Sequence, residues 1–395
     1  MGVAWTVVCF AGTEWRAHPQ RPQWLMTALA EFGAEVIFVE NIGTRSPGLR
    51  DIRRVARRVA YWVRSSLRPD DGAPAGGNEI PRQPHIDSPI VLPNQHLRVI
   101  RALGRATLTR RMRRLTRGGR PLVVWTYLPM PVIGDVAREL AADALVYDWA
   151  DDAAAHVLSP SPAVRERLAA WEDEMIARAD LVFVASAELL RRRGSSNPNT
   201  HVLGHGTPIV RSPASAPLSV SAMPAPRVGF VGTITAWTDL ELLEGIARAR
   251  PEWSLILVGP ASVRLRTLRR LPNVLITGQR PHDEIPSILS LIDVGIIPYR
   301  IEPAIEVASP VKLHEYLAAG LPVVSVDIPE VRLDADAVEV ASGVDGFVAA
   351  IERNLGRSRR PRAGHSTWQD RAAEMVEIVE AALAASGPGD PNPEV

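Results

Sequence analysis

The 395-residue chain has one cysteine, Cys9, and one lysine, Lys312, alongside 44 arginines. A single cysteine excludes a disulfide framework and any zinc site built from cysteines, and it favours a cytosolic compartment. No apolar run approaches the roughly 18 residues that a membrane-spanning helix needs. The excess of arginine over lysine indicates a GC-rich coding background and hence a bacterial source. It also makes Lys312 stand out.

Positive and negative charges are nearly balanced, and the formal net charge is +1 at pH 7. This balance argues against a protein wrapped in nucleic acid. The hydrophobic content of 46% excludes a generally disordered chain. Residues 1–10 are apolar but lack a basic segment before them, and they run directly into Glu14 and Arg16. They are therefore expected to form a buried strand rather than a signal peptide.

Strand-like and helix-like runs alternate along most of the chain, which predicts an α/β fold with parallel sheets. Several runs are continuously apolar, as strands covered on both faces are. The predicted strands are residues 3–10, 35–39, 90–92, 122–125, 144–147, 181–185, 201–203, 227–231, 254–258, 274–277, 294–298 and 323–326. Helices are predicted at residues 22–32, 164–178 and 367–384.

A stretch rich in Pro, Ser and Ala without any period predicts a linker at residues 207–226. It separates a first domain, residues 1–206, from a second Rossmann-type domain, residues 227–365. A C-terminal helix follows at residues 366–385. The last residues, 386–395, are expected to be a disordered tail.

Residues 50–120 concentrate positive charge, with 17 arginines and five acidic residues. From Leu49 to Val63 the apolar residues fall on one helical face and the arginines fill the others. Residues 97–115 indicate a second, less regular helix. Two interpretations stay open: attachment to an anionic membrane surface, or packing on the domain's own sheet with the arginines in water. Nucleic-acid binding is disfavoured because no recognised nucleic-acid module accompanies the arginines.

The sequence indicates both ends of a short helix that lies between two predicted strands of the second domain. Ser309 is a good N-cap, Pro310 a good first helical residue and Gly320 a good C′ residue. The helix begins after the carboxyl end of a strand, where open α/β sheets bind ligands. Its free N–H groups favour an anion such as a diphosphate.

Two charged residues make the prediction of a ligand site at this helix more specific. Lys312 lies in the first turn and adds a positive charge at the same end. Glu315 lies one turn further on roughly the same face, and a carboxylate behind a phosphate site suits a ribose, since it accepts two hydroxyl hydrogen bonds. The pattern predicts a pocket for a nucleoside diphosphate. An ordinary helix with an exposed Lys–Glu pair is the alternative.

The first strand of the second domain, residues 227–231, ends in Gly232 and Thr233. Gly232 lets a ligand approach the backbone closely. A following helix is predicted to open at Thr238, with Glu241 completing a capping box. The pattern GxGxxG is absent here, so the segment does not predict nicotinamide binding.

Three segments of the second domain resemble landmarks of GT-B glycosyltransferases of the family-four type, namely residues 228–234 (VGFVGTI), 293–298 (DVGIIP) and 312–324 (KLHEYLAAGLPVV). The last of these is the most specific. Residues 146–152 and 179–186 are also similar to that family. The resemblance therefore covers nearly the whole chain and is strongest to bacterial enzymes of the teichuronic-acid kind.

The resemblance implies two facing Rossmann-like domains, with an acceptor in the first, a nucleotide-sugar in the second and a C-terminal helix crossing back to the first. It implies transfer of a glycosyl group to a glycan, a lipid-linked or a small-molecule acceptor, with retention of configuration. Neither a metal nor a cofactor is expected besides the nucleotide-sugar substrate. The expected location is cytoplasmic, with peripheral attachment to the inner face of the cell membrane.

Carried over onto this sequence, the expected donor-binding residues are Gly12, Gly232, Thr233, Arg280, Ser309, Lys312, Leu313 and Glu315. Glu315 matches the ribose-binding carboxylate and Lys312 a diphosphate contact. Arg280 ends the turn where such enzymes meet the nucleobase. Gly12 matches the loop that faces the donor from the first domain.

The sequence departs from the family pattern at two points. The family often has a glutamate eight residues before the position of Glu315, where this chain has Val307, and Glu306 is one residue out of register. The basic residue usually found soon after the Gly-rich turn is also missing. These departures leave open a non-catalytic binding or scaffold subunit. A nucleotide-sugar epimerase of the same fold is a second alternative.

No catalytic base is assigned on the acceptor side. Candidates are Asp151, Asp152 and His156, since a carboxylate or imidazole near the acceptor hydroxyl can accept its proton. Capping of the helix that follows is an equally good role for these acids. Arg16 and Arg21 are expected either to meet an acceptor phosphate or to lie on the surface.

Overall fold

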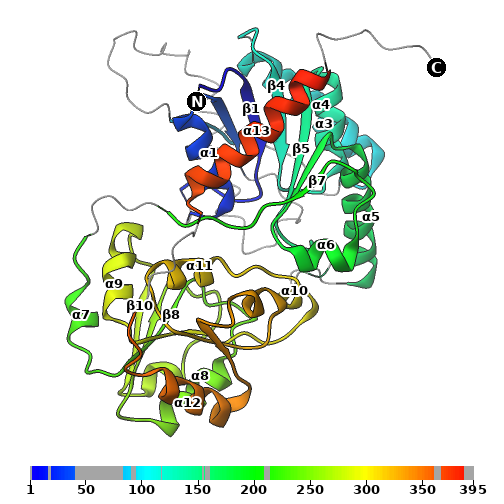
Figure 1. Ribbon diagram of the computed structural model, residues 1–395. Helices are drawn as coiled ribbons and strands as arrows, with labels where there is room; N and C mark the ends of the chain where they lie inside the picture. The colour runs from blue at the N-terminus through cyan, green and yellow to red at the C-terminus, as the bar shows by residue number, and fades with distance from the viewer. Residues whose placement is uncertain are drawn as a thin grey trace.

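The computed structural model describes residues 2–16, 19–40, 83–89, 95–116, 118–153, 155, 161–208, 214–359 and 366–386. These residues form two α/β domains, shown one above the other in Figure 1. The strands of the first domain are β1 (Thr6–Phe10), β2 (Glu35–Val39), β3 (His85–Asp87), β4 (Leu122–Thr126), β5 (Ala144–Trp149), β6 (Leu181–Val184) and β7 (Thr200–Val202). Its helices are α1 (Arg21–Glu31), α3 (Arg98–Leu115), α4 (Pro131–Glu139), α5 (Pro162–Arg178) and α6 (Ala187–Arg193).

The first sheet is parallel, in the order β3-β2-β1-β4-β5-β6-β7. Strand β1 shows why its sequence is apolar at every position. Val7 and Cys9 belong to the core beneath α1, whereas Val8 and Phe10 belong to the core beneath α3, α4 and α5. Because helices cover both faces, alternation of polar and apolar residues is absent.

The second domain contains the strands β8 (Arg227–Val231), β9 (Ser254–Val258), β10 (Val274–Gly278), β11 (Val294–Ile297), β12 (Val323–Ser325) and β13 (Val338–Val340). Its helices are α7 (Leu218–Ser221), α8 (Leu240–Ala249), α9 (Ile285–Leu291), α10 (Pro303–Glu306), α11 (Val311–Ala318) and α12 (Gly343–Asn354). The sheet is parallel in the order β10-β9-β8-β11-β12-β13, so it also has a Rossmann-like topology.

The C-terminal helix α13 (Trp368–Ser386) returns to the first domain, where it lies across the sheet beside α1 (Figure 1). Trp368 and Met375 are buried in the same core as α1. The chain leaving the first domain and the chain returning to it run side by side, because Thr207 and Thr367 form a parallel bridge. Gly206 permits this approach, since a Cβ there would lie 2.6 Å from the Trp368 nitrogen.

The predicted fold class is confirmed: two parallel-sheet, Rossmann-like domains with a returning C-terminal helix. Residues 35–39, 227–231 and 254–258 form strands with the predicted ends. At the edge of the first sheet, β3 at His85–Asp87 pairs with β2, and this strand was not predicted. The structure describes residue 89 but not 90–94, so the predicted strand at 90–92 lies outside the described residues, as do the predicted helix at 49–64 and the tail after Ser386.

Two further local predictions need correction. The expected linker contains the short helix α7. Helix α8 is capped by Asp239, whose side chain accepts from the Leu242 N–H at 3.0 Å, and not by Thr238. Thr238 instead accepts from the Thr235 N–H in the preceding turn, at 3.2 Å. No helix among the described residues is both long and apolar enough to cross a membrane.

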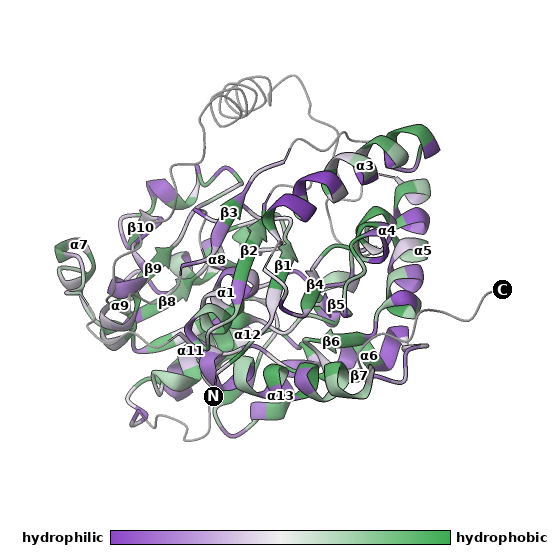
Figure 2. Cartoon of the chain, turned by 90° about the horizontal axis from the view of Figure 1, so that it is seen from above, coloured by the Kyte–Doolittle hydropathy of each residue, from purple (hydrophilic) through white to green (hydrophobic). Residues whose placement is uncertain are grey.

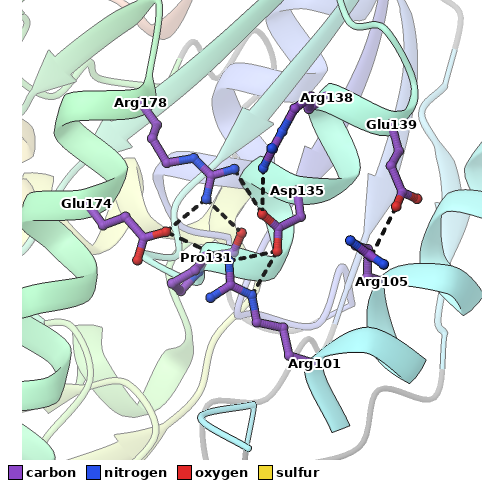
Figure 3. Close-up of polar contacts among 8 residues, drawn as sticks. All are labelled: Arg101, Arg105, Pro131, Asp135, Arg138, Glu139, Glu174 and Arg178. Carbon is purple, nitrogen blue, oxygen red and sulfur yellow. Dashed lines mark hydrogen bonds and ion pairs between the residues drawn. The ribbon is translucent and has the colours of Figure 1, made fainter. Parts of the chain in front are cut away.

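Helix α3 is joined to the first domain by ion pairs around one carboxylate. Asp135 on α4 accepts from Arg101 at 2.7 Å, and from Arg138 and Arg178 at 3.0 Å each (Figure 3). Burial alone would raise the pKa of Asp135, but hydrogen bonds and charge from Arg101 and Arg178 outweigh it and lower that pKa. Asp135 thus connects three helices, α3, α4 and α5.

We expect Asp135→Ala to lower the free energy of unfolding by about 2–3 kcal/mol, because three arginines lose one shared acceptor. Urea denaturation at pH 7 measures this. The matched control is Glu139→Ala on the same helix, which removes a carboxylate paired with the more exposed Arg105 and should cost below about 1 kcal/mol. Because the pKa of Asp135 is lowered, its stabilisation is present at neutral pH and is lost as the pH falls below the ordinary value of 3.8. Equal losses in the two variants would contradict this role of Asp135.

Candidate functional site

Helix α11 is held against the second sheet by Tyr316. The Val231 N–H donates a hydrogen bond to the Tyr316 hydroxyl at 2.7 Å. The ring passes so close to Gly295 that a Cβ there would lie 2.7 Å from it. This contact places α11 on β8 and β11, on the side where open α/β sheets bind ligands at the ends of their strands.

The start of α11 differs from the prediction and its end agrees. Pro310 is the N-cap and the helix begins at Val311. Ser309 is therefore not the N-cap, because Pro310 has extended backbone and delays the first turn. The Ser309 hydroxyl instead lies 3.5 Å from both His314 and Glu330. Gly320 follows the C-cap with φ of +70°, a conformation that glycine adopts without strain.

A pocket opens where β8, β9 and β10 end, next to α11. It is lined by Val231, Gly232, Val258, Gly259, Pro260, Gln279, Arg280, His282, Ile285 and Glu315. Three of the predicted donor residues, Gly232, Arg280 and Glu315, are thereby brought together. The three strands are neighbours in the sheet, so their parallel carboxyl ends converge on this point.

Lys312 lies directly over Gly232. A Cβ at position 232 would come within 2.8 Å of Lys312 Cε, so Lys312 would have to move, and the φ of +141° at Gly232 also favours glycine. The ammonium contacts the Tyr299 hydroxyl and lies 4.6 Å and 5.0 Å from the ring centroids of Tyr299 and Phe230. Cation–π contacts hold the charge at the ends of β8 and β11, and among the residues that the structure describes no carboxylate forms an ion pair with it.

Glu315 faces the same pocket with 17% of its side chain exposed. Burial raises the pKa of Glu315 to about 7, and the Lys312 charge acts in the opposite direction. His282 is in the short 3₁₀ helix His282–Glu284, and its Nε2 lies 3.9 Å from Glu315 Oε1. His282 was not predicted from the sequence, although it follows the Gly278–Arg280 turn by only two residues.

The remaining predicted donor residues are more dispersed. Leu313 is fully buried, so its side chain belongs to the second-domain core rather than to the pocket. Arg280 pairs with Glu284 at 2.7 Å on the pocket wall. Thr233 follows Gly232 and is half-buried, and Gly12 is exposed in the loop after β1.

On the acceptor side, the predicted capping role of Asp152 was wrong, because Ser161 is the N-cap of the helix that follows, α5. Asp152 Oδ1 instead accepts from the Ala155 N–H within the loop, at 2.9 Å. Asp151 beside it is exposed, and His156 lies outside the described residues. The structure therefore assigns no proton acceptor among the three.

The loop carrying these acids is anchored by Glu172, which the sequence analysis missed. Glu172 is fully buried and accepts from the Ala153 N–H at 2.9 Å and the Trp149 indole at 3.2 Å. Its other oxygen accepts from Arg193 at 3.2 Å. Burial raises the pKa of Glu172 to about 7 despite these donors.

Arg21 is not on the surface, contrary to one of its two predicted roles. It is 3% exposed and bonds Asp148 at 2.9 Å and the Gly204 carbonyl at 3.0 Å. Arg16 is exposed. The buried pair joins α1 to the end of β5 and to the chain that leaves the domain.

The segment that precedes α11 packs against the first domain. Figure 1 shows α6 at the lower rim of the first domain and α10 at the facing rim of the second. Arg192 on α6 forms an ion pair with Glu306 on α10. Val307, which replaces the family's glutamate, is 5% exposed and belongs to the first-domain core. Val311 packs against the core on the other face of the same sheet.

Comparison with known proteins agrees with this geometry. Residues 225–356 match the family model described as Glycosyl transferases group 1. A Bacillus subtilis (strain 168) protein, TuaH, whose name describes a teichuronic acid biosynthesis glycosyltransferase, is 28% identical over 262 residues. That alignment covers 61% of this chain and 65% of TuaH, so it spans less than two thirds of either protein.

Solved structures match over the whole length. The Anabaena protein HepE, crystallised with UDP and glucose, aligns with a TM-score of 0.58 at 14% identity, covering 97% of this chain and 99% of HepE. A Listeria monocytogenes protein named as a UDP-N-acetylglucosamine 2-epimerase aligns with a TM-score of 0.57 at 11% identity, covering both chains fully. These likenesses show the fold, which transferases and epimerases share. The chain has the GT-B fold, and its residues 225–356 match the model of the group 1 glycosyl transferases.

Proposed function

We propose that the protein is a glycosyltransferase that moves a sugar from a nucleotide-sugar donor to a glycan, lipid-linked or small-molecule acceptor in the synthesis of a bacterial cell-surface polysaccharide or glycoconjugate. The pocket between β8, β9, β10 and α11 carries this proposal. Glu315 of α11 lines this pocket, and Lys312, in the first turn of the same helix, lies beside it over Gly232. The name of TuaH and the UDP complex of HepE support the donor class.

In the proposed reaction Lys312 and the free N–H groups of α11 bind the diphosphate and stabilise the charge that develops on it as the glycosidic bond breaks. Glu315 accepts hydrogen bonds from the ribose hydroxyls and so orients the donor. The leaving phosphate itself accepts the proton of the acceptor hydroxyl. The reaction is proposed to be retaining and to need neither a metal nor a cofactor.

We expect a nucleoside diphosphate among UDP, GDP, ADP and dTDP to raise the melting temperature of the purified protein. At about 100 times its Kd it should stabilise the fold by about 2.7 kcal/mol. Lys312→Ala and Glu315→Ala should each weaken binding about 10- to 100-fold, since each removes charged hydrogen bonds. Arg248→Ala is the matched control, because Arg248 lies on the exposed face of α8 and pairs only with Glu244 among the contacts described.

The same variants separate the alternatives. Donor binding with sugar transfer that disappears in Glu315→Ala supports a transferase. Conversion of the donor without an acceptor would indicate an epimerase. Binding without turnover over a broad acceptor panel would indicate a scaffold subunit, an outcome that the buried Val307 favours. A wild-type protein that binds none of these diphosphates would overturn the site assignment.

Donor affinity should fall with acidity because the pKa of Glu315 is raised to about 7. The ionised carboxylate is the form that accepts two ribose hydroxyls, so a nucleotide-sugar should bind about tenfold more weakly at pH 6 than at pH 8. A nucleotide-sugar is preferable to a free diphosphate, because its phosphates do not titrate in this range. Calorimetry on Glu315→Gln is the control and should show weaker binding without the slope. An equal slope in both proteins would exclude Glu315 as its origin.

We also propose peripheral attachment to an anionic membrane through α3, which lies at the edge of the first domain beside α4 and α5 (Figure 2). Near its N-terminus three apolar side chains face solvent, Leu97 (49% exposed), Val99 (72%) and Leu103 (54%). Part of the basic charge is already neutralised, because Arg101 and Arg105 pair with acids of α4. The apolar side chains therefore support attachment more directly than the arginines do.

We expect the protein to co-sediment with vesicles that contain phosphatidylglycerol, and less with pure phosphatidylcholine. Replacing Leu97, Val99 and Leu103 together by serine should weaken binding about tenfold or more, because these side chains lose their burial in the interface. Leu333→Ser is the control, as Leu333 is 69% exposed on the second domain. Unchanged sedimentation of the triple variant would leave only the packing interpretation of this helix.

A further inference from the structure

His282 stands opposite the ribose-binding carboxylate of the proposed donor site. It lines the same pocket as Glu315 and Gly232, with its Nε2 3.9 Å from Glu315 Oε1. We propose that His282 is a second ribose-reading residue, and that Trp24 of the first domain is the positioning residue that sets its ring. This inference rests on the proposed function and names a group that determines its specificity.

The spacing between the two side chains suits a hydroxyl group. At 3.9 Å the imidazole and the carboxylate are too far apart for a direct hydrogen bond, but an oxygen between them can lie about 2.8 Å from both. The bridging group must donate to the carboxylate and also accept from an imidazole N–H. A sugar hydroxyl does both, whereas a phosphate oxygen only accepts and would be repelled by Glu315.

The His282 ring is held across the domain boundary. Trp24 lies on α1 of the first domain, and its ring centroid is 4.9 Å from that of His282 at an interplanar angle of 51°. Trp24 does not itself line the pocket. It therefore acts on the donor only through His282, and ribose recognition depends on the two domains being arranged as they are here.

The test compares ribose and deoxyribose ligands. Calorimetry measures the Kd of UDP against 2′-deoxy-UDP and 3′-deoxy-UDP, with the GDP and ADP series run in parallel. In the wild type, loss of the hydroxyl that bridges Glu315 and His282 should weaken binding about tenfold. In His282→Ala, UDP should bind about tenfold more weakly, and loss of the same hydroxyl should cost little more. Independent, additive losses would show that His282 only shapes the pocket and would overturn the proposal.

The role of Trp24 is tested by the same comparison of ribose and deoxyribose ligands. Trp24→Ala should reduce the ribose-to-deoxyribose ratio towards that of His282→Ala, while Trp24→Phe retains an aromatic face and should restore it. Trp171→Ala is the control, since Trp171 stacks with Arg167 on α5 and should not change the ratio. A melting temperature within a few degrees of the wild type shows that each variant is folded. An unchanged ratio in folded Trp24→Ala would remove Trp24 from the proposal.

The proposed donor site and the proposed ribose-reading role of His282 can be disproved separately. If no nucleoside diphosphate binds the wild-type protein, the proposed donor site itself fails. If UDP or another diphosphate binds and requires Lys312, but the deoxy ligands show no coupling to His282, only the inference about ribose reading is overturned.

Discussion

The pocket beside α11 depends on one buried contact, that of Tyr316 between the helix and the sheet. The absence of a side chain at Gly295 lets the ring lie close against β11, and the hydroxyl accepts the Val231 N–H at the end of β8. A buried N–H left without a partner costs about 1–3 kcal/mol, so the position of the hydroxyl is strongly favoured. Once Tyr316 is placed, helical spacing puts Lys312 over Gly232 and Glu315 at the pocket wall.

Contacts with the first domain then position the start of α11. Val307 is buried in the core on one face of the first sheet, and the half-buried Val311 packs against the core on the other face. Burying one valine is worth about 1.5–3 kcal/mol, whereas the half-exposed Arg192–Glu306 pair contributes at most about 1 kcal/mol. The apolar contacts therefore dominate this junction. Any separation of the domains exposes both valines and also withdraws Trp24 from His282.

The sequence was sufficient for the fold and for half of the pocket, because both depend on local patterns. Apolar runs such as residues 35–39 and 227–231 mark strands covered on both faces, and Lys312, Glu315 and Gly320 follow helical spacing. The sequence was insufficient where the residues in contact lie far apart along the chain. Arg21 and Asp148 are 127 positions apart. His282 and Trp24 belong to different domains. Strand β3 has three residues, too few for a period to appear.

The departure at Val307 bears on chemistry as well as on packing. A one-residue shift of register does not return Glu306 to the pocket, because Glu306 already pairs with Arg192 on the first domain and Val307 would have to leave a core to make way. In the proposed site, the charge available to a diphosphate therefore comes from Lys312 and the N-terminus of α11. Such a site can still bind and orient a nucleotide-sugar. The groups that would separate transfer from binding alone must then meet the sugar rather than the phosphates, and the first-domain loops after β1 and β5 are where this chain has such groups to offer.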